Sequence, residues 1–511
     1  MTVTRTEEPT AQTAQTAQTA QTAQTAQAVR TAPPALPAGA PAAAPGLADA
    51  AGTLTGAALT RRVLAAAGEL RGRGVGPGDR VLVKGDNCVD YVVALLALMH
   101  LDASLVPVDH RQSAADGRFA ARRARARWLL TREAAAADLP GERVLAYPGL
   151  GAGHAPLDGE VDLSAWFARA DAVVLWSSGT TGPPKGIVKS GRALHDNTLR
   201  TIAAMGYRAD DVLAPLLPFS HQYGLSVVLL WWLAGCTLAV TAYQRLDVAL
   251  AQAAGHGVTA VDAAPSTYHS LLGVVRRRPE LRAALSRVRV WGVGGAPLPA
   301  PLAAAFPAAL GRPLLDGYGL TELGNVALAT PDVPIGCGRP LPGIEVRVVR
   351  PDGGPAAPGE LGEIEVLSPG LMEGHLLDDG TLAPVPQGSW YRTADLGHLD
   401  PEGHLYVVGR NQAVHRSGFT LYPESLERKA EACGRQVKAL AVEDLRRGCA
   451  LHFVVADPEG GSPAQWRRRM APHLAEYEQP NAVHVVDRFP LSANGKTDTA
   501  ALRKMVGVEA A

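Results

Sequence analysis

The alternation of short, continuous apolar segments with longer helical segments constrains the fold of this chain most. Residues 80–83 and 104–108 are mostly apolar runs of strand length, and residues 89–101 between them are long enough for a helix. Further strands are expected near residues 172–176, 258–261 and 288–293. Wholly apolar strands that alternate with helices form parallel sheets covered on both faces. The chain is therefore predicted to contain a large α/β lobe of doubly wound sheets.

The pattern changes in the second half of the chain. Residues 344–349 alternate polar and apolar with period two and return after a turn at 362–367, which predicts a β-hairpin. From residue 410 the chain is richer in charge and mixes short strands with helices. We expect a large domain over residues 49–409, with mixed sheets and a β-rich subdomain, and a small α+β domain over 410–511.

The N-terminal segment has a composition that cannot bury a core. Residues 10–27 are six repeats of Thr-Ala-Gln, and residues 32–45 are rich in alanine and proline. Low-complexity segments of this kind stay disordered because they have too little apolar surface to offset the loss of chain entropy. Residues 1–48 are therefore predicted to be a disordered tail, either a neutral extension or a docking segment.

Composition excludes several classes of protein. The chain has 49 Lys and Arg against 49 Asp and Glu, so it lacks the basic surplus of proteins that bind nucleic acid or anionic membranes. Its five cysteines are scattered without a C-x-x-C pair, which excludes a disulfide framework and a thiolate zinc site and predicts a cytoplasmic location. The most apolar stretch, residues 225–240, is shorter than the ~18–20 residues of a membrane span and is interpreted as a buried helix.

The strongest chemical motif is a glycine- and hydroxyl-rich loop directly after an expected strand. The string WSSGTTGPPKGIVK occupies residues 176–189. Its backbone amides and hydroxyls can surround phosphate oxygens, and Lys185 adds a positive charge. The loop differs from the P-loop of NTPases because Pro184 stands where their second glycine would be. On composition alone, an ordinary surface loop is an equal alternative.

Residues 177–186 resemble the phosphate-binding signature of the acyl-adenylate-forming (AMP-binding) superfamily, which contains acyl-CoA synthetases, luciferases and peptide-synthetase adenylation domains. Later segments match the family in the same order, and the resemblance covers about residues 54–502. It implies that the chain binds ATP and magnesium, with coenzyme A or a carrier-bound phosphopantetheine as the acceptor. The cofactor-binding residues that it implies are Ser177, Ser178, Gly179, Thr180, Thr181, Gly182, Lys185, Gly294, Gly295, Ala296, Asp316, Gly317, Tyr318, Gly319, Asp395, Arg410 and Gly418.

The resemblance also implies individual roles at the nucleotide. Tyr318 would stack on adenine, and the Asp395 carboxylate would accept hydrogen bonds from both ribose hydroxyls. Thr321 would contact the α-phosphate. Thr181 and Glu322 would hold magnesium, which takes few carboxylates and otherwise phosphate oxygens and water.

Two further residues complete the expected catalytic set of Lys496, His221, Thr321 and Glu322. Lys496 would bridge the substrate carboxylate and the α-phosphate, and so offset the charge that develops during the reaction. His221, within residues 217–224, would lie at the acyl pocket. Amino-acid-activating relatives usually carry an aspartate in this segment, and its absence here favours an acid without an α-amino group.

The departures from the family pattern fall in the C-terminal domain. Gly418 belongs to a loop that would approach the thiol after this small, mobile domain rotates. Gln412 stands where most relatives carry an Asp or Lys hinge, and the segment 410–418 is one residue shorter than usual. The transfer step is therefore the one for which an alternative acceptor is considered.

The predicted function is ATP-dependent conversion of a carboxylic acid to acyl-AMP with release of pyrophosphate, followed by transfer to the thiol of coenzyme A or of a carrier protein acting in trans. Bringing a carboxylate to a phosphate requires positioning and cationic stabilisation more than a protein nucleophile. Two alternatives stay open: transfer to a non-thiol nucleophile such as an amine, and a non-catalytic nucleotide-binding relative. A luciferase-like oxidative role is compatible with the same motifs.

Overall fold

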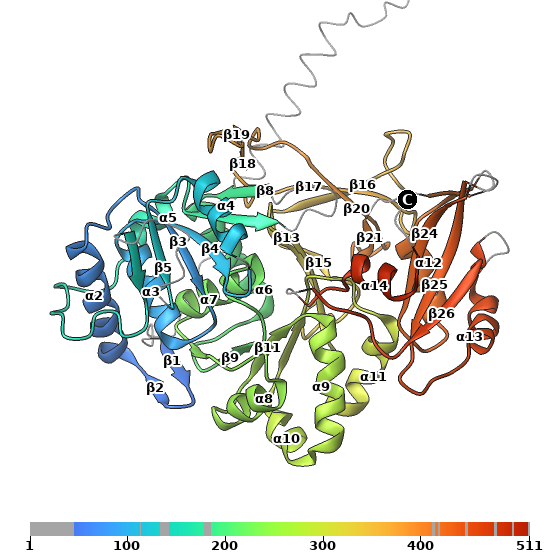
Figure 1. The fold of residues 1–511 in the computed structure, drawn as a ribbon, viewed down its shortest axis with the longest axis horizontal. Helices are drawn as coiled ribbons and strands as arrows, with labels where there is room; N and C mark the ends of the chain where they lie inside the picture. The colour runs from blue at the N-terminus through green and yellow to red at the C-terminus, as the bar shows by residue number, and fades with distance from the viewer. Residues whose placement is uncertain are drawn as a thin grey trace, which may run out of the picture.

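The computed structural model describes residues 45–112, 114–132, 143–177, 185–410, 414–416, 419–444, 448–474, 478–492 and 495–508. Figure 1 shows an α/β lobe with a smaller domain beside it, which carries β24 to β26 and α12 to α14. The predicted fold class is confirmed: mixed sheets with helices form the lobe, and a sheet-rich small domain follows.

The first large sheet has the strand order β19-β18-β8-β7-β4-β3-β5-β6. Its strands are β3 (Arg80–Gly85), β4 (Ser104–Asp109), β5 (Trp128–Thr131), β6 (Val144–Ala146), β7 (Val173–Ser177), β8 (Lys185–Lys189), β18 (Gly374–Leu376) and β19 (Leu382–Pro384). The central pairs β4–β3 and β3–β5 are parallel, whereas β8 runs antiparallel to β7. Helices of this part are α2 (Gly56–Gly72), α3 (Val89–His100), α4 (Ala114–Ala124), α5 (Ser164–Ala168) and α6 (Gly191–Met205).

The second large sheet has the order β15-β14-β13-β12-β11-β9-β10-β1-β2. Its strands are β1 (Gly46–Asp49), β2 (Gly52–Leu54), β9 (Val212–Pro215), β10 (Thr237–Ala239), β11 (Ala260–Ala263), β12 (Val290–Val293), β13 (Leu315–Leu320), β14 (Gly324–Leu328) and β15 (Arg339–Pro340). The run from β10 through β9, β11 and β12 to β13 is parallel. The helices that connect these strands are α7 (Gln222–Ala234), α8 (Leu246–Gly255), α9 (Pro265–Arg277), α10 (Pro279–Ala284) and α11 (Ala300–Leu310).

The β-rich subdomain and the small domain complete the chain. The subdomain sheet, in the order β16-β17-β20-β21, consists of β16 (Glu345–Val349), β17 (Gly362–Leu367), β20 (Tyr391–Leu399) and β21 (Leu405–Arg410). The predicted hairpin is thus present as β16 and β17, which pair antiparallel. The small domain contains β22 (Val414–Arg416), β23 (Phe419–Leu421), β24 (Val437–Asp444), β25 (Gly448–Ala456), β26 (Ala482–Val486), α12 (Pro423–Glu431), α13 (Pro463–Met470) and α14 (Thr499–Met505).

Two sequence predictions were wrong in part. The apolar stretch 225–240 is not one helix, because α7 stops at Gly235, whose left-handed backbone (φ 67°) ends it, and β10 follows. The expected tail also extends too far: β1 begins at Gly46 and pairs in parallel with β10, and Leu47 and Ala48 are buried. The partner strand β10 lies almost two hundred residues away, so local composition could not indicate this pairing, whereas the second partner, β2, follows β1 directly. Residues 1–44 lie outside the described residues.

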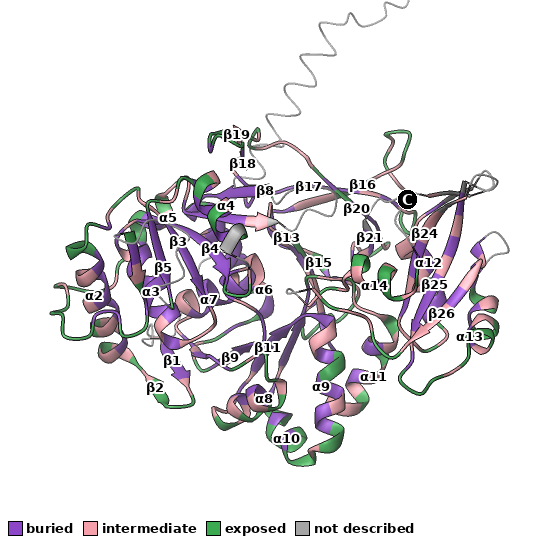
Figure 2. Cartoon of the chain, in the orientation of Figure 1, coloured by how far each residue is buried: buried purple, intermediate pink, exposed green. Residues whose placement is uncertain are grey.

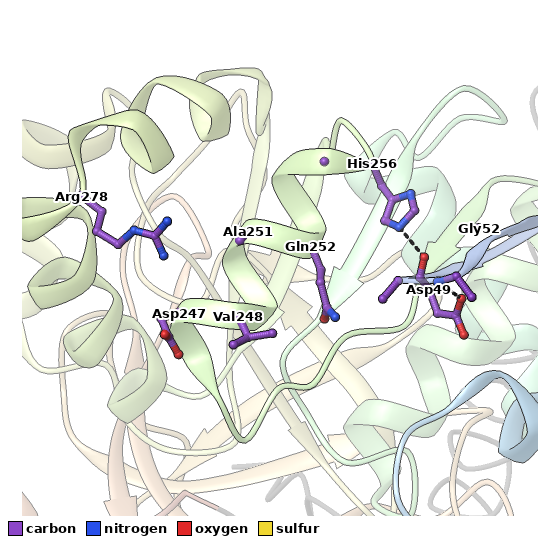
Figure 3. A pocket seen from close by; sticks show the side chains of 11 residues that line it. Asp49, Gly52, Asp247, Val248, Ala251, Gln252, His256 and Arg278 are labelled. Carbon is purple, nitrogen blue, oxygen red and sulfur yellow. Dashed lines mark hydrogen bonds between the residues drawn. The ribbon is translucent and has the colours of Figure 1, made fainter.

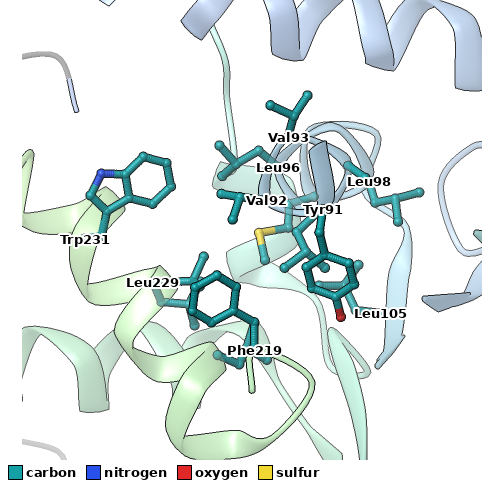
Figure 4. Close-up of a cluster of buried hydrophobic side chains, with 14 of the residues drawn as sticks. Tyr91, Val92, Val93, Leu96, Leu98, Leu105, Phe219, Leu229 and Trp231 are labelled. Atoms are coloured by element: carbon teal, nitrogen blue, oxygen red, sulfur yellow. The ribbon is translucent and has the colours of Figure 1, made fainter. Parts of the chain in front are cut away.

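Buried residues follow the strands and one side of the helices (Figure 2). In Figure 4, Phe219, Leu229 and Trp231 from the region of α7 face Tyr91 and Leu96 on α3. This packing holds α7, whose N-terminal end follows His221, against α3. Within the described part of the chain, no helix combines the length and hydrophobicity needed to cross a membrane.

Candidate functional site

Several predicted site segments meet at the carboxyl edge of the second sheet. His221 lies before the first residue of α7, after β9, while Gly294 and Gly295 follow β12. Val293 at the end of β12 pairs with Asp316 in β13. A side chain at Gly294 would begin 3.3 Å from the Gly317 carbonyl oxygen, so these glycines let two backbone segments approach. Ligands of open α/β sheets bind at this edge, which is where the sequence motifs converge.

Tyr318 and Asp395, predicted to contact adenine and ribose, lie in direct contact. The Tyr318 hydroxyl donates a 2.8 Å hydrogen bond to Asp395 Oδ2, and both side chains are buried. Thr393 Oγ1 accepts a hydrogen bond from the Asp395 amide (3.1 Å) and donates one to the Ile364 carbonyl (2.8 Å). The second sheet and the β-rich subdomain are therefore joined through two residues of the expected nucleotide site.

Asp316, one of the predicted cofactor-binding acids, has a perturbed pKa. Burial raises the pKa of Asp316 to about 7, partly opposed by the Cys337 thiol, whose Sγ lies 3.5 Å from Asp316 Oδ2. A carboxyl group held in this way changes charge near neutral pH.

Glu322 is held through its main chain and keeps its carboxylate available. The Glu322 carbonyl accepts hydrogen bonds from the Met372 amide (2.7 Å) and from Lys189 Nζ (3.2 Å). Lys189 also donates to the Gly370 carbonyl (2.5 Å), and it is completely buried. Among the described residues, none forms an ion pair or hydrogen bond with the Glu322 carboxylate. A carboxylate without a described protein partner can serve as an oxygen ligand of a magnesium ion.

Lys189 was not assigned a role from the sequence. Burial lowers the pKa of Lys189 to about 7, and the carboxylates of Glu322 and Glu373 act in the opposite direction. The signal was present in the string KGIVK, because a lysine at an inward position of a buried strand needs polar partners there.

Much of the predicted phosphate loop lies outside the described residues: Ser178, Gly179, Thr180, Thr181 and Gly182. Its two ends are described, because the backbone of Ser177 in β7 pairs with that of Lys185 in β8. The Lys185 side chain is exposed. The pKa of His375 on β18 is lowered, chiefly by burial. Lys185 lowers this pKa further, whereas the Glu322 carboxylate acts to raise it. These three side chains therefore share one electrostatic environment.

His221 faces a buried acid that sequence analysis did not identify. Its Nε2 lies 3.9 Å from Oδ2 of Asp109, the last residue of β4. Burial acts to raise the pKa of Asp109, but hydrogen bonds from Arg111 outweigh it and leave that pKa lowered. Asp109 is consequently an anion that can orient the imidazole or stabilise its protonated form.

The lysine loop of the small domain docks on the large lobe. Ser266, in the first turn of α9 after β11, donates a 2.6 Å hydrogen bond from its hydroxyl to the Gly495 carbonyl. Within the loop, the Ser492 amide donates to the Lys496 carbonyl (2.7 Å), and Gly495 has a left-handed backbone (φ 74°). The Lys496 side chain is exposed. Lys496 is thus held at the same sheet edge as the predicted acyl and nucleotide residues.

The remaining predicted residues are placed only in part. The backbone of Arg410 pairs with that of Asp395, which brings the end of β21 to the ribose residue. Ala296 follows Gly295, and Gly319 lies in β13 beside Tyr318. Gly418 and Gln412 lie outside the described residues.

A surface hollow lies elsewhere, between the β1–β2 turn and α8. Figure 3 shows it lined by Asp49, Gly52, Gln252, His256 and Arg278, among others. The Asp49 carbonyl accepts a 2.9 Å hydrogen bond from His256 Nε2. This surface hollow contains none of the predicted site residues, several of which meet at the carboxyl edge of the second sheet instead.

Comparison with known proteins identifies the family. The profile described as AMP-binding enzyme matches residues 34–376. Feruloyl-CoA synthase of Amycolatopsis sp is 30% identical over 475 residues, which cover 89% of this chain and 94% of that protein. The structure of o-succinylbenzoate CoA synthetase (MenE) from Bacillus subtilis with its acyl-adenylate intermediate has a TM-score of 0.77 and is 25% identical, covering 96% of this chain and 98% of that one. The amide bond synthetase McbA from Marinactinospora thermotolerans also has a TM-score of 0.77 at 25% identity, covering 95% and 99%. The chain therefore belongs to the AMP-binding enzyme family and is an ATP-dependent ligase that works through an acyl-adenylate.

Proposed function

We propose that this ligase activates a small carboxylic acid with magnesium and ATP at the carboxyl edge of the second sheet, with Lys496 at the reacting carboxylate. The observation that carries the proposal is the hydrogen bond from Ser266 to Gly495, which docks the lysine loop beside the end of β11. In that position a single ammonium group can face both the acid and the α-phosphate.

The other residues supply the charges and donors that the reaction needs. Attack of the carboxylate oxygen on the α-phosphorus forms the mixed anhydride and releases pyrophosphate, so negative charge builds up around the phosphorus. Glu322 would hold magnesium, since its carboxylate has no described protein partner, and Lys185 would contact the phosphates. Asp395 and Tyr318 would hold the nucleoside. These interactions act by positioning and by stabilising charge.

The first acceptor to consider is coenzyme A, as in the feruloyl-CoA and succinylbenzoate relatives, and a carrier-protein phosphopantetheine is chemically equivalent. A thiol attacks the adenylate carbonyl and AMP leaves. An amine acceptor is the second candidate, supported by the similarity to the amide bond synthetase McbA over nearly the whole length of both chains. Both acceptors attack the same carbonyl, so the first half-reaction does not distinguish them.

The test begins with ATP–pyrophosphate exchange across a panel of aryl, short-chain, fatty, dicarboxylic and amino acids. Lys496→Ala is expected to slow exchange by about 10²- to 10³-fold, the loss typical of removing a group that stabilises developing charge. Lys504→Ala, an exposed lysine of the same domain, is the matched control and should leave exchange unchanged. Full exchange activity in the Lys496→Ala protein would contradict the role of this loop.

The acceptor is then identified by adding coenzyme A, a phosphopantetheinylated carrier or an amine to the preformed adenylate and determining the product by mass spectrometry. Gly418→Trp is expected to block thiol transfer and to spare adenylation. Equal loss of both half-reactions, or of neither, would argue against the role predicted for that loop.

A further inference from the structure

Asp262 is a buried carboxylate that the reaction described above does not use. It lies in β11, and 7% of its surface is exposed. The Tyr223 hydroxyl donates a 2.9 Å hydrogen bond to its Oδ1. In the described part of the chain, nothing donates a hydrogen bond to its Oδ2, and no lysine, arginine or histidine pairs with it.

This arrangement is costly to the fold. A buried carboxylate is normally paired with a cation or with several donors, because removing it from water without them is strongly unfavourable. Burial accordingly raises the pKa of Asp262 to about 6, and the hydrogen bond from Tyr223 only partly opposes this. A largely buried carboxylate with one oxygen that no described protein group donates to, at an edge where ligands bind, is typical of a group that a ligand completes.

The neighbours of Asp262 place it beside the acyl side of the site. In β12, Gly292 lies directly across from Asp262, and a side chain at Gly292 would begin 2.4 Å from Asp262 Oδ1. A side chain at Gly294 would begin 3.3 Å from the Tyr223 ring. The pair therefore borders the glycines that precede the nucleotide residues, and Ser266, four residues after Asp262, holds the lysine loop.

Tyr223 also links Asp262 to the segment that carries His221. The segment 217–224 contains no aspartate, and on that ground the sequence favoured an acid without an α-amino group. The fold supplies a carboxylate to this segment from β11 instead, through the tyrosine two residues after His221. The sequence places the end of this strand, at Ala263, near the acyl pocket, but the sequence alone did not single out Asp262.

We propose that Asp262, positioned by Tyr223, accepts a hydrogen bond from a hydroxyl or amino group on the acyl part of the substrate, so that the substrate is a carboxylic acid bearing such a donor. This inference rests on the proposed adenylation and names the substrate class for it. A hydroxyl and an ammonium can each donate a hydrogen bond to Asp262 Oδ2. An ammonium also attracts the carboxylate through its positive charge.

The experiment compares acids that differ only in the donor. ATP–pyrophosphate exchange is measured with the intact protein for 4-hydroxybenzoate, 4-aminobenzoate and 4-methylbenzoate, and for 6-hydroxyhexanoate, 6-aminohexanoate and heptanoate. The best acid of the panel used for the proposed function is compared with its own analogue lacking the donor. The wild type is expected to prefer one donor-bearing acid by about 100-fold or more in kcat/KM, because sites built to bind a donor reject analogues that lack it.

Asp262→Asn and Asp262→Leu are expected to reduce that preference to within about threefold while the analogue without the donor is still activated. Tyr223→Phe removes only the positioning hydroxyl and should reduce the preference by an intermediate factor, which provides a second test if an Asp262 variant does not fold. Asp211→Asn is the matched control: Asp211 is also buried, but it pairs with Arg289 and Thr259, so the preference should be unchanged.

The outcomes separate the two hypotheses. If no acid supports exchange in the wild type, the proposed function itself fails. If acids are activated but the best one carries no donor, or if the Asp262 variants lower kcat/KM equally for both members of a pair, the substrate inference is overturned and the adenylation proposal stands. Preference for the hydroxyl over the amino member, or the reverse, identifies the donor.

Discussion

The contact that docks the lysine loop can be tested by removing one side-chain oxygen atom. Ser266→Ala removes the hydroxyl that donates the 2.6 Å hydrogen bond to the Gly495 carbonyl, and leaves the helix and the loop otherwise intact. A hydrogen bond between neutral groups contributes about 0.5–1.5 kcal/mol net. Weakening the docked state by that amount changes its population by about 2- to 12-fold. The adenylation rate is therefore expected to fall by up to this factor, with KM for ATP unchanged.

Ser270→Ala is the matched control for this prediction. Ser270 lies one turn further along α9, and its exposed hydroxyl donates to the Ser266 carbonyl (3.1 Å) without reaching the small domain. Single-turnover formation of the acyl-adenylate is measured by rapid quench for both variants. An unchanged rate in Ser266→Ala would show that this bond does not hold Lys496 in place. A loss beyond about 100-fold would exceed what one neutral hydrogen bond can supply and would refute the docking argument.

Three further predictions follow from the same structure. Tyr318→Phe removes the 2.8 Å donor to a buried carboxylate and should weaken AMP binding and lower the free energy of unfolding by about 1–3 kcal/mol, measured by calorimetry and urea denaturation; unchanged values for both would contradict the contact. Gly495→Ala places a side chain at φ 74° and 3.1 Å from Ser266 Oγ, so adenylation should fall further than in Ser266→Ala, with equal rates counting against the geometry. Burial raises the pKa of Glu431 from 4.5 to about 7, so its stabilising contribution is complete below pH 4.5 and is lost as the pH rises through 7. Glu431→Gln should therefore gain stability relative to the wild type between pH 5 and pH 8, by up to about 3 kcal/mol, and a difference independent of pH would refute this.

The sequence predicted the lobe well wherever local pattern decides the structure. The runs at 80–83 and 104–108 became β3 and β4, and the alternating segment at 344–349 became β16, because each buries one or both faces in a regular way. The prediction failed at 225–240 and at Gly46–Asp49, where β10 pairs with β9 and with β1, and β1 pairs with β10 and β2. Strand pairing across such distances leaves no signal in local hydropathy.

The candidate site likewise contains residues that sequence motifs predict and residues that only the three-dimensional fold brings together. Motif residues such as Tyr318 and Asp395 were predicted individually, and the structure adds that their side chains form a hydrogen bond with each other. Asp109, Lys189, Asp262 and Ser266 were not predicted, although each lies within or just after a buried strand. Their importance depends on which strands are neighbours, and only the three-dimensional arrangement supplies that information. A charged residue inside an otherwise apolar strand is the signal that could have found Lys189 and Asp262.

The modest size of the Ser266–Gly495 hydrogen bond is consistent with the two-step chemistry. The small domain is joined to the lobe near the hinge, where Arg428 donates to the Val407 carbonyl and α12 packs on β21. At the sheet edge, the Ser266–Gly495 hydrogen bond, worth about 1 kcal/mol, is one side-chain contact of the lysine loop. If the small domain rotates between half-reactions, as the family resemblance predicts, a contact of this size lets Lys496 engage for adenylation and leave afterwards. Replacing Ser266 by a residue that docks more strongly, such as Arg, should therefore slow thiol transfer more than adenylation, and slowing of adenylation alone would contradict that division.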